Sequence, residues 1–79
     1  MFNVELWEAA DISRRNDGVP YAWTNKKQIA QFKDVDELKK YIKHNLEDLT
    51  NVVIFSSSAT LISAANSYLT DKLKEASLL

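Results

Sequence analysis

The residues best suited to chemistry in this sequence are one histidine and two acids close to it, His44, Glu47 and Asp48. A nucleophile needs a positioned base, and His44 falls beside Lys40 and Lys43 on the polar side of a predicted helix, where we expect it to be solvated. Neighbouring helix positions point in different directions, so the two acids do not converge with His44 on a metal site. One histidine without any cysteine also argues against zinc. We therefore expect no catalytic residue, no metal and no cofactor.

The segment from Ser56 to Ser58 is a second candidate site, because it follows a predicted strand and precedes a predicted helix. Unpaired backbone N–H groups at such a position can bind a phosphate or another anion. Phosphate-binding loops rely on glycine for close approach and often on a lysine, and this segment has neither. We therefore predict that the serines cap the helix, with anion binding as the open alternative.

The segment from Lys26 to Lys43 is the third candidate, with six lysines against three acids and with Tyr21 and Trp23 just upstream. Basic residues interleaved with aromatics can follow a nucleic-acid backbone and stack bases. The alternative is a solvated lysine face, which we favour because local acids can pair with these lysines, as Asp36 can with Lys40.

Composition limits the class of protein. The chain has 79 residues, with ten basic and eleven acidic side chains and a net charge of −1, which excludes a strongly basic nucleic-acid clamp and a strongly acidic mimic. The absence of cysteine excludes disulfides and fits a cytoplasmic protein. No basic leader and no apolar stretch of the roughly 18 residues that span a bilayer is present. We expect a complete, soluble, single domain over residues 1–79, with no membrane contact.

Three strands are predicted in the first half of the chain. Residues 2–7 alternate between apolar and polar side chains, as in a half-buried strand, and Asn16, Asp17 and Gly18 form a strong turn signal. Residues 19–24 and 27–33 then read as a hairpin around a turn at Asn25 and Lys26. This register places Trp23 opposite Gln28, Tyr21 opposite Ala30 and Val19 opposite Phe32.

Two helices and one strand are predicted in the second half. Asp34 with Glu37 predicts a capped helix from Val35, with an apolar arc of Val35, Leu38, Tyr41, Ile42, Leu46 and Leu49. Residues 52–55 read as a strand covered on both faces. The last helix has an apolar arc of Leu61, Ile62, Ala64, Ala65, Tyr68, Leu69, Leu73 and Ala76, and a polar side of Ser63, Asn66, Ser67, Thr70 and Lys74. The predicted core is Leu38, Ile42, Ile54, Leu61, Ala65 and Leu69.

These elements predict an α+β fold, a single small domain with a mostly antiparallel four-stranded sheet and two helices packed on one face, in the order βββαβα. The opposite face of the sheet then stays open. A tryptophan and an isoleucine among polar neighbours on that face indicate a binding surface. Its predicted residues are Glu5, Trp7, Lys27, Ile29, Gln31 and Lys33. The alternative is that Trp7 and Ile29 pack on each other, or under the loop of residues 11–18, and serve only stability.

A small domain without catalytic residues most often acts by presenting a surface. The sequence therefore favours a non-enzymatic binding protein that modulates or inhibits a larger partner, a protein or protein complex, as do the small inhibitors encoded by phages and mobile elements. The alternative is a nucleic-acid-binding or transcription-regulating module that uses Lys26 to Lys43. A small-molecule enzyme ranks third, because so small a core can hardly spare a pocket. The oligomeric state stays open, as does whether the sheet face or a helix face binds.

Overall fold

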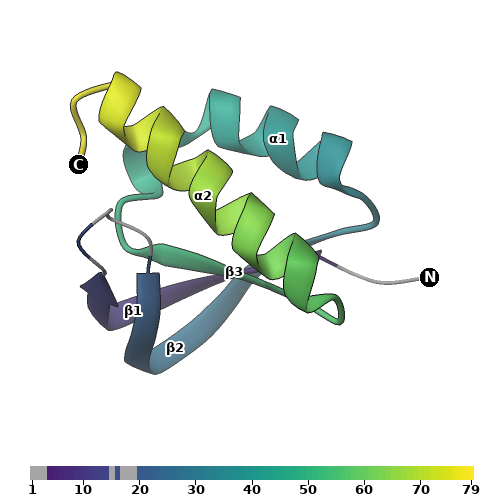
Figure 1. The fold of residues 1–79 in the computed structure, drawn as a ribbon, viewed down its shortest axis with the longest axis horizontal. Helices are drawn as coiled ribbons and strands as arrows, with labels where there is room; N and C mark the ends of the chain where they lie inside the picture. Colours follow the sequence, from purple (N-terminus) through teal and green to yellow (C-terminus); the bar gives the residue numbers. More distant parts are fainter. Residues whose placement is uncertain (1–3, 15, 17–19) are drawn as a thin grey trace.

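The computed structural model describes residues 4–14, 16 and 20–79 of the chain, excluding the side chains of residues 10–12 and 21–25. The predicted turn at Asp17 and Gly18 and the facing of Tyr21 and Trp23 lie outside this description. The elements are β1 (Val4–Arg14), β2 (Pro20–Phe32), α1 (Val35–His44), the short 3-10 helix η1 (Leu46–Asp48), β3 (Val52–Ser56) and α2 (Ala59–Glu75) (Figure 1).

The fold is α+β, as predicted, with an antiparallel sheet and both helices on one of its faces (Figure 1). The sheet has three strands in the order β2-β1-β3, so the predicted four-stranded sheet is wrong among the described residues, and the order is ββαβα. β1 is the central strand and pairs with both neighbours. The helices and the sheet enclose the core between them, so that none of the described helices covers the opposite face of the sheet (Figure 1).

The missing strand is explained by the predicted hairpin at Asn25 and Lys26, which does not form. Residues 20–32 are one continuous strand, in which Ala30 pairs with Leu6 and Gln28 with Trp7, both on β1. A two-residue hairpin turn favours positive φ angles, and no residue here has one. Because β1 offers partners along the whole length of β2, the strand continues without a turn.

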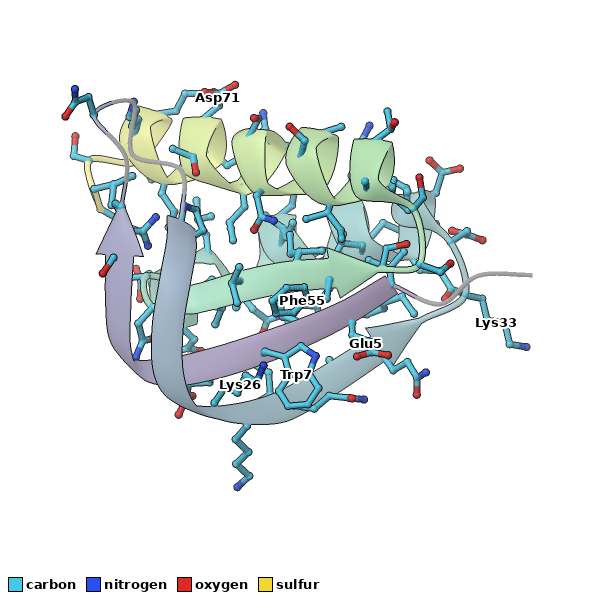
Figure 2. The ribbon with its side chains drawn as sticks, turned by 60° about the horizontal axis from the view of Figure 1, so that its bottom comes forward. Glu5, Trp7, Lys26, Lys33, Phe55 and Asp71 are labelled. Atoms are coloured by element: carbon cyan, nitrogen blue, oxygen red, sulfur yellow. The ribbon has the colours of Figure 1, made fainter. Side chains whose placement is uncertain are left out.

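A bulge bends the antiparallel pair formed by β1 and β2. The pairing shifts between Leu6 and Trp7, which leaves Ile29 as an extra residue on β2 between the partners Ala30 and Gln28. An extra residue on one strand bends the pair and strengthens its twist. Figure 2 shows that the second half of β1 and the first half of β2 bend together.

The core lies between the sheet and the helices, and each element supplies its apolar side. Its fully buried large side chains are Val4, Leu6, Leu38, Ile42, Leu49, Val52, Ile54, Leu69 and Leu73. The predicted core is therefore confirmed, except that Leu61 is only partly buried at its edge. The predicted cap of α1 is also confirmed, since the Asp34 carboxylate accepts a hydrogen bond from the Glu37 N–H at 3.0 Å.

The buried side of α2 differs from the prediction. Asn66 and Thr70, which we assigned to the polar side, are 2% and 1% exposed, whereas Ala64 and Ala76 are exposed. The Asn66 side chain accepts a hydrogen bond from the Ile54 N–H at 3.0 Å, and its amide nitrogen donates to the Ile54 carbonyl at 2.9 Å. Thr70 donates to the Asn66 carbonyl at 2.8 Å. Both polar side chains are buried because their hydrogen bonds are made inside the protein.

These bonds close one edge of the sheet. β3 pairs only with β1, so the other edge of β3 would present bare peptide groups. The Asn66 amide occupies both groups of Ile54 on that edge and thereby attaches α2 to the sheet. On the opposite side, toward β1, Asn51 extends the pairing before β3: its backbone carbonyl accepts from the Ala9 N–H and its side chain donates to the Ala9 carbonyl, both at 3.1 Å.

The end of α2 has a capping motif that places the C-terminal residues on the core. Ser77 has a positive φ of 59°, and its N–H donates to the Lys74 carbonyl at 3.1 Å. The Leu78 N–H donates to the Leu73 carbonyl at 2.8 Å. This is the Schellman arrangement of a helix end. It turns the chain so that Leu78 packs against the core.

We expect Ile42→Ala to lower the free energy of unfolding by about 2 to 5 kcal/mol, because the change removes a fully buried side chain from the core face of α1. Denaturant melts of the two proteins measure this difference. Lys40→Ala, at an exposed position of the same helix, is the matched control and should change stability by less than about 0.5 kcal/mol. A loss of that smaller size for Ile42→Ala would contradict the docking of α1.

We expect Asn66→Ala to lower the free energy of unfolding by about 1 to 3 kcal/mol, because it leaves the N–H and carbonyl of Ile54 without their side-chain partners. Amide hydrogen exchange should show the Ile54 N–H losing its protection first. Ser63→Ala, at an exposed position on α2, is the control for helix propensity alone. Unchanged exchange at Ile54 would show that Asn66 does not close this edge.

Candidate functional site

The candidate site is the face of the sheet that lies opposite the helices. Because Val4 and Leu6 point into the core, the alternation along β1 sends Glu5 and Trp7 to this open face. β3 adds Phe55, which is paired with Glu5, and Val53, which is paired with Trp7.

Four side chains make contact on this surface, and we call Glu5, Trp7, Lys26 and Phe55 the open-face cluster. The Trp7 indole N–H donates to a Glu5 carboxylate oxygen at 2.9 Å. The Lys26 ammonium lies 5.8 Å from the centre of the Trp7 ring and 5.6 Å from that of Phe55. Figure 2 shows the four gathered in front of the sheet. A cation shared by two aromatic rings is attracted by both, which helps to hold them in place.

This face has a small apolar centre of its own. Trp7 and Phe55 are half-buried, and Val53 is only 3% exposed although no helix covers this side. Val53 is also outside the cluster of side chains that forms the core beneath the helices. Gln28 and Gln31 lie beside this centre on β2 and are exposed. An apolar centre within a polar rim is the usual composition of a protein interface.

The structure brings together three of the six predicted site residues. Gln31 pairs with Glu5, and Glu5 is bonded to Trp7, so all three lie on the open face. Lys27 instead pairs with Glu8, which alternates with Trp7 along β1 and therefore belongs to the other face.

The other two predicted residues lie outside the cluster. Ile29 is the extra residue of the bulge and is 38% exposed. Lys33 follows the end of β2, where its backbone N–H donates to the Glu37 carboxylate at 3.4 Å, and Figure 2 shows its side chain pointing away from Trp7. The ring that shares a cation with Trp7 is Phe55, which the sequence analysis did not select.

Sequence reasoning missed Lys26 and Phe55 for two reasons. Lys26 was assigned to the turn that does not form. Phe55 was assigned to a strand covered on both faces, which is correct for Val52 to Ile54 and wrong for Phe55, because its side chain is only partly buried. The available signal was the unbroken apolar run itself. Since alternate residues point to opposite faces, such a run on a sheet with helices on one side only must supply an apolar patch to the open side.

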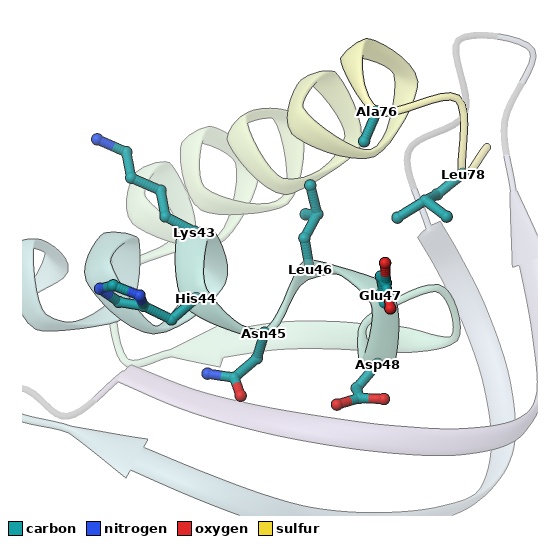
Figure 3. Close-up of a pocket in the computed structure, with 8 residues that line it drawn as sticks. All are labelled: Lys43, His44, Asn45, Leu46, Glu47, Asp48, Ala76 and Leu78. Atoms are coloured by element: carbon teal, nitrogen blue, oxygen red, sulfur yellow. The ribbon is translucent and has the colours of Figure 1, made fainter.

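The histidine and acids of the first candidate site lie close in the sequence but do not converge (Figure 3). They line a surface hollow of about 370 Å³ between the end of α1, η1 and the end of α2 (Figure 3). His44, Glu47 and Asp48 are exposed, and Figure 3 shows His44 pointing away from the two acids. Among the residues that the structure describes, no group of three or more such side chains could hold a metal ion.

The serines before α2 cap the helix as predicted. The Ser58 hydroxyl accepts a hydrogen bond from the Leu61 N–H at 3.3 Å, and the Ser56 hydroxyl accepts one from the Ser58 N–H at 3.2 Å. These hydroxyl groups are therefore engaged within the chain.

The lysines of the third candidate site are spread over several surfaces. Lys26 lies on the open face, and Lys27 belongs to the other face of the sheet. The Lys39 ammonium lies 5.1 Å from the centre of the Tyr68 ring on the helical side of the sheet. Lys72, which is outside this segment, lies 5.5 Å from the same ring. The segment therefore does not form one continuous basic surface.

Comparisons of the chain with protein-family models, with curated proteins and with solved structures find no match. None of the described helices combines the length and the apolar character that crossing a membrane requires. A proposal about function therefore starts from the geometry of the open face.

Proposed function

We propose that this chain is a non-enzymatic binding protein that modulates a larger protein or protein complex by docking its open sheet face on it. The observation that supports this proposal is the open-face cluster. Two half-buried aromatic side chains lie on the sheet face that none of the described helices covers, and both contact the same lysine. Interface residues that contribute most to affinity are enriched in tryptophan and are surrounded by polar residues that exclude water.

The contacts within the cluster favour binding because they order the rings in advance. Glu5 fixes the indole through its N–H, and Lys26 lies over both rings. Side chains that are already ordered lose less conformational entropy when a partner arrives. The cluster has one cation and one anion, so the main contribution to affinity would come from burial of the rings rather than from net charge.

The proposed modulation is steric. A standard protein interface buries roughly 800 Å² on each partner, which is a large share of the surface of so small a domain. A sheet face docked in this way can cover a functional surface of its partner and thereby inhibit it. No conformational change and no catalytic residue of this chain is needed.

We expect Trp7→Ala to weaken the complex by at least about thirtyfold, because truncating an interface anchor of this kind removes 2 kcal/mol or more. The partner is first captured with a photo-cross-linking residue at Gln31 on the open face, compared with the same residue at Ser63 on α2. Affinity is then measured with the purified partner at a temperature where circular dichroism shows each variant to be folded. Tyr68→Ala, an aromatic truncation on the helical side, is the matched control and should change affinity by less than about twofold.

A different result would assign Trp7 to stability alone. If Trp7→Ala lowers the thermal midpoint strongly while the folded fraction keeps its affinity, the open face is not the binding site. Capture through Ser63 in preference to Gln31 would contradict the proposal in the same way.

Nucleic-acid binding has less support, because Glu5 lies against Trp7 and the lysines are dispersed. We expect no association of micromolar strength with random DNA or RNA at physiological salt. If the Lys26 to Lys43 segment did bind nucleic acid, affinity would fall steeply with ionic strength, and Lys27→Glu and Lys40→Glu would weaken it for every sequence tested. Fluorescence anisotropy titrations at two salt concentrations test this, and tight, salt-dependent binding would replace the protein-partner proposal.

A further inference from the structure

The two edges of the sheet differ in how their backbone groups are treated. The outer edge of β3 is closed at Ile54 by the Asn66 amide. The opposite edge of the sheet is formed by β2, which pairs with β1 alone. An edge strand presents a row of peptide groups that can accept a further strand.

The pairing pattern shows which groups of β2 point outward. Because both Ile54 groups bond to Asn66, the pair of Ile54 with Leu6 is a non-hydrogen-bonded pair, and the N–H and carbonyl of Leu6 point toward β2. The same groups of Glu5 and Trp7 then point toward β3. Their partners on β2 are Gln31 and Gln28, whose own N–H and carbonyl groups therefore point away from the sheet.

No described donor or acceptor reaches these outward groups. The hydrogen bonds that the described residues make beyond the strand ladders include none from the backbone of Gln28 or Gln31. The side chains of both residues are exposed. The edge is therefore accessible at two peptide groups, on either side of the bulge at Ile29.

The charge on this edge specifies the kind of strand that fits it. The Lys26 ammonium lies over Trp7 and Phe55 on the open face. Lys27 on this strand and Lys33 directly after it are exposed, however, and residues 27–33 have no acid. A second copy of β2 placed alongside would bring lysines close to lysines, which is unfavourable across strands. A segment with carboxylates would instead gain from the same charges.

We propose that the outer edge of β2 between Lys27 and Lys33 binds an extended acidic peptide segment as an added strand. Main-chain hydrogen bonds to Gln28 and Gln31 would supply affinity, and the lysines would select for carboxylates, as in other cases of strand addition. The bulge limits regular pairing, so the bound segment is short. This site is the edge of the sheet, whereas the function proposed above uses the open face, and each can fail without the other.

The probe is a blocked eight-residue peptide of alternating glutamate and valine, and its counterpart has lysine in place of glutamate. Nuclear magnetic resonance titration of the full chain should show binding of the acidic peptide, with the largest shifts at the amides of Gln28 and Gln31. The lysine peptide should not bind. Binding of both peptides alike, or of neither, would overturn the proposal.

A proline substitution isolates the outward N–H. Gln31→Pro removes a donor that points away from β1, so the ladder between β1 and β2 is kept, as proline on an edge strand allows. We expect this change to weaken peptide binding by about tenfold. Gln31→Ala keeps the N–H and should change binding by less than about twofold. Thermal melts identify any loss of folding, and Gln28→Ala with Gln28→Pro repeats the comparison if the first variant does not fold.

Three results would overturn the edge site. The first is equal affinity for the proline and alanine variants. The second is loss of peptide binding in a folded Trp7→Ala variant, which would move the site to the open face. The third is displacement of the peptide by a single-stranded RNA of eight uridines, which would show that the lysines recognise phosphate.

Discussion

The structure depends on the pair of hydrogen bonds between the Asn66 amide and the backbone of Ile54. An asparagine amide has one acceptor and a donor group in nearly the same arrangement as a peptide group, so it can replace a neighbouring strand at one position. The bonds are buried, where an unpaired peptide group is costly. They place α2 against β3 and close that edge of a sheet that has only three strands.

The open face follows from this arrangement. With α1 and α2 both on one side and β3 closed by α2, the second face of the sheet has no helix to cover it. The apolar residues that β1 and β3 direct to this side must then pack among themselves. Trp7 and Phe55 both lie within reach of the Lys26 ammonium, and Val53 is buried although it lies outside the main core. The proposed binding surface is therefore a consequence of how the two helices are attached.

The two edges of the sheet differ in how they are protected from pairing with a further strand. The Asn66 side chain closes the edge of β3 at Ile54, whereas the edge of β2 has lysines and a bulge in place of a covering element. Lysines and bulges are the usual means by which edge strands avoid pairing with copies of themselves. On this chain the lysines also give the edge a positive charge. A positive charge favours an acidic segment over a second copy of β2.

The sequence by itself determined the local elements. The cap at Asp34, the cap at Ser58 and the alternation along β1 follow from interactions within a few residues, which a sequence pattern records directly. Only the tertiary structure decided the rest. Whether residues 20–32 turn or continue depends on the long partner that β1 provides, and whether Asn66 faces water or the core depends on the distant Ile54. For the same reason Glu5, Trp7 and Gln31 could be placed on one face from the sequence, while Lys26 and Phe55 joined them only through strand pairing.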